Sequence, residues 1–171
     1  MIGKYINFGE ITINFRHSID HFVDNNLRKI EDGGILFYTR VDKDDFPADR
    51  KNGDILVEKY AVCELSKGLI QDRRIMLDFG IQETESSLEG ILYLAYLQKD
   101  GDAGTLLVNG LSNVFYIRDK VGETRALFLT WKERVGHDRF CDKKAFTFFS
   151  LPITLVTGWE KGTRIFIPIT D

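Results

Sequence analysis

Polar side chains at the start of one predicted helix are of the types that bind metals. His21 and Asp24 follow His17, and histidines four residues apart on a helix can share a metal ion. Ser18 is the expected N-cap residue, however, which leaves His17 outside the helix. Ser18 also stands where the zinc-protease pattern requires Glu. The competing interpretation is therefore a solvated polar helix face.

A second group of such side chains lies in a predicted loop of the C-terminal half. His137 and Cys141 are four residues apart, and a thiol nucleophile needs a nearby base that lowers its pKa. A metal-assisted or thiol hydrolase using His21, Asp24, His137 and Cys141 is thus one hypothesis, and it requires the two segments to meet in space. The alternative for the loop is a polar turn with an incidental cysteine.

Other patterns of catalytic or metal-binding proteins are missing from the sequence. The acidic loop 42–54 does not fit a calcium-binding EF-hand, because alignment on Gly53 puts Ala48 and Arg50 at ligand positions. The chain contains no phosphate-binding loop, no Gly-x-Gly-x-x-Gly and no Gly-x-Ser-x-Gly. We therefore predict no metal site and no cofactor, and we leave open whether the chain is an enzyme.

Aromatic residues are the strongest candidates for binding. Trp131 and Trp159 are each flanked by charged residues, and Trp159 falls in a predicted hairpin tip where burial within the chain is difficult. Exposed Trp is typical of binding hot spots. Tyr93 and Tyr96 lie on a predicted helix that is apolar nearly all round, which indicates burial or contact with a partner. The alternative for Trp159 is that it folds back over the sheet edge.

The elements that must position these side chains follow from hydrophobic periodicity. Segment 18–31 has one apolar stripe and predicts a helix, and segment 86–98 begins with a capping-box pattern, Ser86 to Glu89, and predicts a second. A buried strand is the alternative for 86–98. Alternating or β-branched segments predict strands at 4–15 (with two short strands broken at Gly9 as the alternative), 35–41, 55–65, 74–81, 105–109, 113–119, 125–133, 143–151, 153–158 and 163–170.

Two connectors in the C-terminal half predict hairpins. Residues 120–124 and 159–162 each contain one glycine between apolar segments. Pro168 has no amide donor, so the final strand is expected to lie at a sheet edge or to end there.

Composition favours an ordinary globular protein. The 171 residues are 43% hydrophobic and 29% charged, with a net charge of −3. We predict a single domain, 1–171, of the α+β class, with a mixed or mainly antiparallel sheet system of about eight to nine strands, two helices and a β-rich C-terminal half. With two cysteines and no apolar signal core, the expected location is the cytoplasm.

The leading functional hypothesis is protein–protein interaction. A small accessory, inhibitor or immunity-type protein of a bacterium, phage or mobile element would have this profile, with a homodimer as one form of the interaction. The interspersed charges favour neither nucleic acid nor a membrane as partner. The alternatives are the hydrolase above and a small-ligand-binding domain with a pocket among the Phe- and Tyr-rich strands.

Overall fold

The strands form one mixed sheet. The computed structural model describes residues 4–16, 38–39, 55–80, 86–98, 100–132, 144–154 and 158–169. Within these ranges the sheet has seven strands in the order β1-β3-β7-β4-β5-β6-β2. They are β1 (Tyr5–Arg16), β2 (Tyr38–Thr39), β3 (Ile55–Leu65), β4 (Ser112–Arg118), β5 (Thr124–Lys132), β6 (Ala145–Pro152) and β7 (Arg164–Pro168). The pairs β4–β7 and β2–β6 are parallel, and the other neighbours are antiparallel.

Two helices cover opposite faces of this sheet. They are α2 (Asp72–Phe79) and α3 (Leu88–Leu97). Side chains alternate along β4, so that Phe115 and Ile117 join α3 in one buried apolar cluster, whereas Val114 and Tyr116 join α2 in another. Burial on both faces explains why the sequence of β4 is an almost continuous apolar run.

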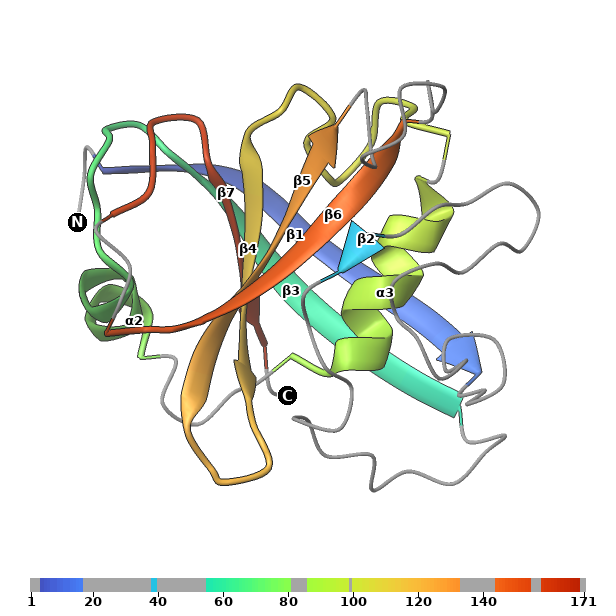
Figure 1. Ribbon diagram of the computed structural model, residues 1–171, viewed down its shortest axis with the longest axis horizontal. Helices are drawn as coiled ribbons and strands as arrows, with labels where there is room; N and C mark the ends of the chain where they lie inside the picture. Colours follow the sequence, from blue (N-terminus) through green and yellow to red (C-terminus); the bar gives the residue numbers. More distant parts are fainter. Residues whose placement is uncertain are drawn as a thin grey trace.

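Figure 1 shows that the sheet is strongly twisted, with β1 and β3 running behind and across β5 and β6. α3 lies on the right of this view, and α2 lies at the left, beside the chain that leads into β7. Accumulated strand twist produces such a crossing.

Most of the predicted elements are confirmed. The strands predicted at 4–15, 55–65, 113–119, 125–133, 143–151 and 163–170 and the helix predicted at 86–98 are observed to within about two residues. The hairpin at 120–124 is also confirmed, because β4 pairs with β5 up to Arg118 and Thr124. β1 is one strand with a bulge between Asn7 and Gly9, not two.

The prediction of a strand at 74–81 is wrong, because this segment belongs to the helix α2. Asp72, Ile75 and Met76 are buried at helical spacing, and Leu77 is 63% exposed. Gly80 ends the helix in the left-handed conformation, with φ of 67°. Asp72 is thus the first residue of a helix.

The sheet has fewer strands than predicted. The described part of the chain contains six strands of five residues or more and the two-residue β2, so the predicted eight to nine are not confirmed. Residues 105–109 form an irregular loop, and Ile153 and Thr154 form a turn. The α+β class and the mixed, strand-rich sheet are confirmed; the described residues contain two helices, of which only α3 was predicted as one.

The position of the last strand corrects the second hairpin prediction. β7 lies inside the sheet, between β3 and β4, and it does not pair with a strand at 153–158. Pro168 is its last residue, so the expectation that the strand ends there is confirmed and the edge position is wrong.

Several predictions fall outside the described residues. These are the helix at 18–31, the acidic loop 42–54 and the hydrolase candidates His21, Asp24, His137 and Cys141, together with His17. Of the strand predicted at 35–41 only β2 is described. Within the described ranges, no helix has the length and apolar character needed to span a membrane.

Candidate functional site

Trp159 lies in the interior and not at an exposed hairpin tip. Only 7% of its surface is exposed. Its indole packs edge-on against Phe128, with ring centroids 5.1 Å apart. Its Nε1–H donates to Oδ1 of Asp72 over 2.6 Å. The predicted exposure of Trp159 is therefore wrong, because a buried carboxylate gives its N–H a partner inside the chain.

Asp72 is the polar centre of this region. It has no exposed surface, and its Oδ1 also accepts a hydrogen bond of 2.7 Å from the Tyr116 hydroxyl. Burial raises the pKa of Asp72, and the hydrogen bonds from Trp159 and Tyr116 oppose this rise. Burial and the neighbouring carboxylate raise the pKa of Tyr116, which keeps its hydroxyl available as a donor. Among the described residues, Oδ2 of Asp72 has no hydrogen-bond partner.

Backbone contacts fix the chain around Trp159. Its amide donates to the Ile70 carbonyl over 3.0 Å, and its carbonyl accepts from the Leu69 amide over 2.7 Å. Gly158 has φ of 134°, and a Cβ there would lie 2.9 Å from the Leu69 backbone. Leu69 is the one non-glycine residue with positive φ in the described part of the chain. Only glycine fits this close approach at Gly158.

A cleft opens beside Trp159. Its volume is about 270 Å³, and we call it the Trp159 cleft. One wall is the chain just before and at the start of β4, and the other is the chain that precedes β7. Its lining residues are Gly110, Leu111, Ser112, Gly158, Trp159, Glu160 and Thr163.

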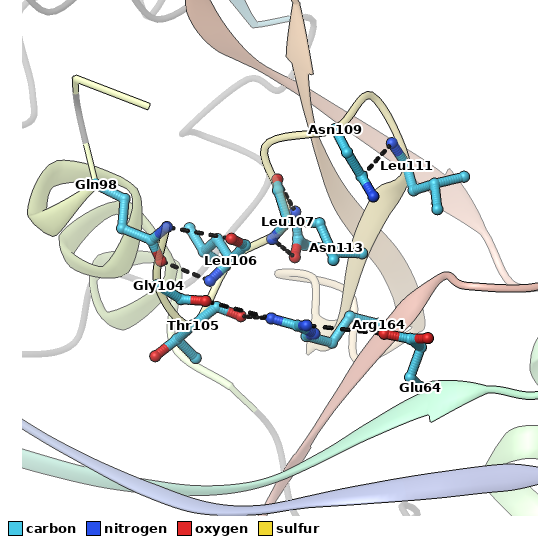
Figure 2. A network of polar contacts seen from close by, with 10 residues as sticks. All are labelled: Glu64, Gln98, Gly104, Thr105, Leu106, Leu107, Asn109, Leu111, Asn113 and Arg164. Carbon is cyan, nitrogen blue, oxygen red and sulfur yellow. Dashed lines mark hydrogen bonds and ion pairs between the residues drawn. The ribbon is translucent and has the colours of Figure 1, made fainter. Parts of the chain in front are cut away.

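Side-chain amides hold the loop that carries the first wall. Figure 2 shows this network of contacts with the backbone of residues 104–107. Gln98 accepts from the Leu106 amide over 2.5 Å and donates to the Leu106 carbonyl over 3.1 Å. Asn113 makes the same paired contact with Leu107, at 2.7 and 3.1 Å. These bonds replace the strand pairing that was predicted for 105–109.

Arg164 connects the same loop to the sheet. Its guanidinium donates to the carbonyls of Thr105 and Gly104 over 2.5 and 3.4 Å and lies 3.7 Å from the Glu64 carboxylate (Figure 2). Burial lowers the pKa of Arg164, and the charge of Glu64 counteracts this effect. The loop is thus fixed from α3, β4 and β7, which makes the cleft wall preorganised.

The other aromatic candidates lie on the opposite face of the sheet from α2. Trp131 is buried with 7% exposure, in edge-on contact with Phe146 at 4.9 Å. Tyr93 and Tyr96 on α3 are stacked, with centroids 6.4 Å apart. Tyr96 is 43% exposed and the next residue, Leu97, is 56% exposed. The structure therefore brings the tyrosines together on the sheet face that also carries Trp131, whereas Trp159 belongs to the cluster on the other face.

The hydrolase hypothesis stays a prediction, because its four residues lie outside the described ranges. Among the residues that are described, no three His, Cys, Asp or Glu side chains are grouped so that they could hold a metal ion.

The sequence singled out Trp159 as a candidate binding residue but gave no indication of the polar residues around it. Asn113, Tyr116 and Thr163 were treated as ordinary strand residues, and Asp72 and Ser112 were not singled out. Asn113 opens an apolar strand, and a buried amide at such a position can bind backbone groups. For Asp72 the sequence holds no such signal, because its partners are 44 and 87 residues away.

The raised pKa of Asp72 predicts a particular pH dependence of stability. A folded-state pKa above the unfolded value of about 3.9 means that the folded protein binds this proton more tightly. This contribution to stability is complete below about pH 4 and is lost as the pH rises through the folded-state pKa. We therefore expect the difference in the free energy of unfolding between wild type and Asp72→Asn to fall as the pH rises from about 4 through the folded-state pKa of Asp72. Urea denaturation at a series of pH values measures this difference.

Asp100→Asn is the control for this comparison, because Asp100 is exposed. Asp78 has a lowered pKa, because hydrogen bonds from Tyr5 and Arg74 outweigh the effect of burial, which alone would raise this pKa. Its contribution to stability therefore changes with pH in the opposite direction. This contribution is the same in wild type and in both variants, so it cancels in the comparison. Parallel pH profiles for wild type and Asp72→Asn would contradict the assignment.

Comparison with protein-family models, curated proteins and solved structures gives no match for this chain. The cleft and the exposed end of α3 are therefore the observations on which its function can be argued.

Proposed function

We propose that this chain is a small binding protein that acts through contact with another protein, in an accessory, inhibitor or immunity-type role. The proposed contact surface consists of Tyr93, Tyr96 and Leu97, and we call it the α3 surface. The observation that supports this proposal is the exposure of Tyr96 (43%) and Leu97 (56%) beside the stacked Tyr93.

The rest of α3 is firmly anchored. Ile91, Leu92, Leu94 and Ala95 are at most 4% exposed, and they pack in the cluster that also contains Phe115 and Phe166. Glu58 on β3 accepts a hydrogen bond from Ser87, and the Ser87 hydroxyl in turn accepts from the Gly90 amide over 3.0 Å. Ser87, and not the predicted Ser86, thus caps the helix.

A rigid aromatic surface is well suited to binding. Tyrosine supplies a large contact area with few rotatable bonds, and it is enriched at interface hot spots. Because α3 is already ordered, a partner would not have to compensate for ordering it. The supporting argument is thus one of preorganisation together with residue type.

Photo-crosslinking in cells that naturally express the chain tests this proposal. A benzophenone amino acid replaces Tyr96, and the matched control places it at Val121, which is 72% exposed in the β4–β5 connection. We expect one discrete crosslinked product from position 96 and none from position 121. Adding Leu97→Ser is expected to reduce the yield by about fivefold or more, as for loss of a contact worth over about 1 kcal/mol.

A product of twice the chain mass would identify a second copy as the partner. The proposal is wrong if position 96 gives no product or the same products as position 121.

A further inference from the structure

We propose that the Trp159 cleft binds a small organic cation, through an alkylammonium group held by Ser112, Glu160 and Thr163. This site is separate from the α3 surface, because none of the cleft-lining residues belongs to α3. Binding at this cleft can therefore be tested independently of the α3 surface.

The size of the cleft limits the ligand to a few heavy atoms. Pockets for drug-sized ligands measure roughly 300–1,000 Å³. The Trp159 cleft, at about 270 Å³, equals the volume of about nine water molecules at ~30 Å³ each. A short aliphatic amine or one long side chain is of the appropriate size.

Three of the residues that line the cleft, Ser112, Glu160 and Thr163, have oxygen-bearing side chains. Thr163 is only 1% exposed, and its hydroxyl makes none of the side-chain hydrogen bonds seen in the described part of the chain. In the same part of the chain, the Ser112 hydroxyl and the Glu160 carboxylate are also without a side-chain partner. A hydroxyl at the wall of a cleft can exchange its hydrogen bond to water for one from a ligand that donates to it.

An alkylammonium group matches these three oxygens. It carries three N–H donors and no acceptor. Glu160 is the one charged residue among the described residues that line the cleft, so the local charge there favours a cation over an anion. Leu111 and the Trp159 side chain supply apolar wall for the aliphatic part of the ligand.

The geometry of the cleft is fixed before a ligand binds. The Asp72 carboxylate fixes the indole of Trp159 from the interior, and the Asn113 contacts with Leu107 hold the chain before Gly110. Leu69, with a positive φ of 61°, packs against Gly158. Backbone conformations of this kind cost about 1–3 kcal/mol and are concentrated at functional sites.

The experiment is an NMR titration of the full chain with n-butylammonium, with n-butanol and butyrate as isosteric probes. The indole N–H of Trp159 reports on the cleft, and that of Trp131, on the opposite sheet face, is the internal reference. We expect butylammonium to shift the Trp159 signal saturably while the Trp131 signal stays constant. Butanol and butyrate are expected to bind more weakly by about tenfold or more, since they lack the charge or reverse it.

Two variants assign the contacts. Glu160→Gln changes an exposed residue and is expected to weaken butylammonium binding by about two- to fivefold, whereas Glu123→Gln in the β4–β5 connection leaves it unchanged. Thr163→Val keeps the side-chain shape and is expected to weaken binding by about two- to tenfold. If Thr163→Val does not fold, the comparison of Glu160→Gln with Glu123→Gln alone tests the proposed site.

The proposal is overturned if no probe gives a saturable shift of the Trp159 signal, if butyrate binds as well as butylammonium, or if Glu160→Gln binds like wild type. Nα-acetyl-lysine amide distinguishes two sources of the cation. Binding at least as tight as that of butylammonium assigns the cleft to a lysine side chain of a partner, and weaker binding assigns it to a free small amine.

Discussion

Replacement of Trp159 by alanine is expected to lower the free energy of unfolding by about 3–5 kcal/mol, as for other large buried side chains. The indole is 7% exposed and packs against Phe128. Its removal leaves a cavity between α2 and the sheet and takes away one of the two hydrogen bonds to Oδ1 of Asp72. Urea denaturation followed by far-ultraviolet circular dichroism measures the change, since this signal does not depend on tryptophan.

Trp159→Phe separates the two contributions. It keeps most of the aromatic packing and loses the N–H donor, so we expect a loss of about 1–3 kcal/mol for the carboxylate that is left with one fewer partner. Val121→Ala, at a site that is 72% exposed, is the control and is expected to stay within about 0.5 kcal/mol of wild type. A loss below about 1 kcal/mol for Trp159→Ala would mean that the indole is exposed, as the sequence suggested.

The sheet could be predicted largely because its strands carry local signals. β4 and β5 combine β-branched and aromatic residues, and the connection between them contains Gly122 with φ of 85°. The alternation of Ile11 and Ile13 with Thr12 likewise identified β1. In these segments the local preference agrees with the position in the fold, so the sequence alone is sufficient.

The errors arose where long-range contacts override local preference. Gly162 and the flanking apolar segments suggested a hairpin, but β7 instead pairs with β3 and β4. The eight-residue α2 is too short to have a strong helical signal of its own, and its packing on the sheet stabilises it.

The candidate site shows the same limit. Trp159 was predicted to be a binding residue because of its type, but its burial depends on Asp72, which is distant in the chain. Thr163 and Ser112 are common residue types in strands. Their hydroxyls become notable only when the fold places them on one cleft, which periodicity cannot reveal.

Asn113→Leu is expected to lower the free energy of unfolding by about 2–4 kcal/mol, because it leaves backbone groups that Asn113 now satisfies without partners. Asn113 is fully buried, and its amide contacts the N–H and carbonyl of Leu107 and, over 3.4 Å, the carbonyl of Leu129. Leucine has the same branched arrangement of four side-chain heavy atoms and is not smaller, so the loss does not come from a cavity. Urea denaturation measures it.

Asn109→Ala is the matched control in the same loop. Asn109 is exposed and its side chain accepts one hydrogen bond of 3.1 Å from the Leu111 amide (Figure 2), so we expect a loss of about 0.5–1 kcal/mol. If Asn113→Leu and Asn109→Ala lower the free energy of unfolding equally, then Asn113 does not hold this loop through its buried hydrogen bonds.

Hydrogen exchange locates the effect of Asn113→Leu within the chain. The Leu107 amide loses its acceptor and is expected to lose protection, whereas amides in the centre of β5 should follow only the global change in stability. Because the chain between Leu107 and Ser112 forms one wall of the Trp159 cleft, the same variant is expected to weaken butylammonium binding although Asn113 does not line the cleft. Loss of protection at Leu107 without a change in affinity would show that this wall is held by Gln98 and Arg164 alone.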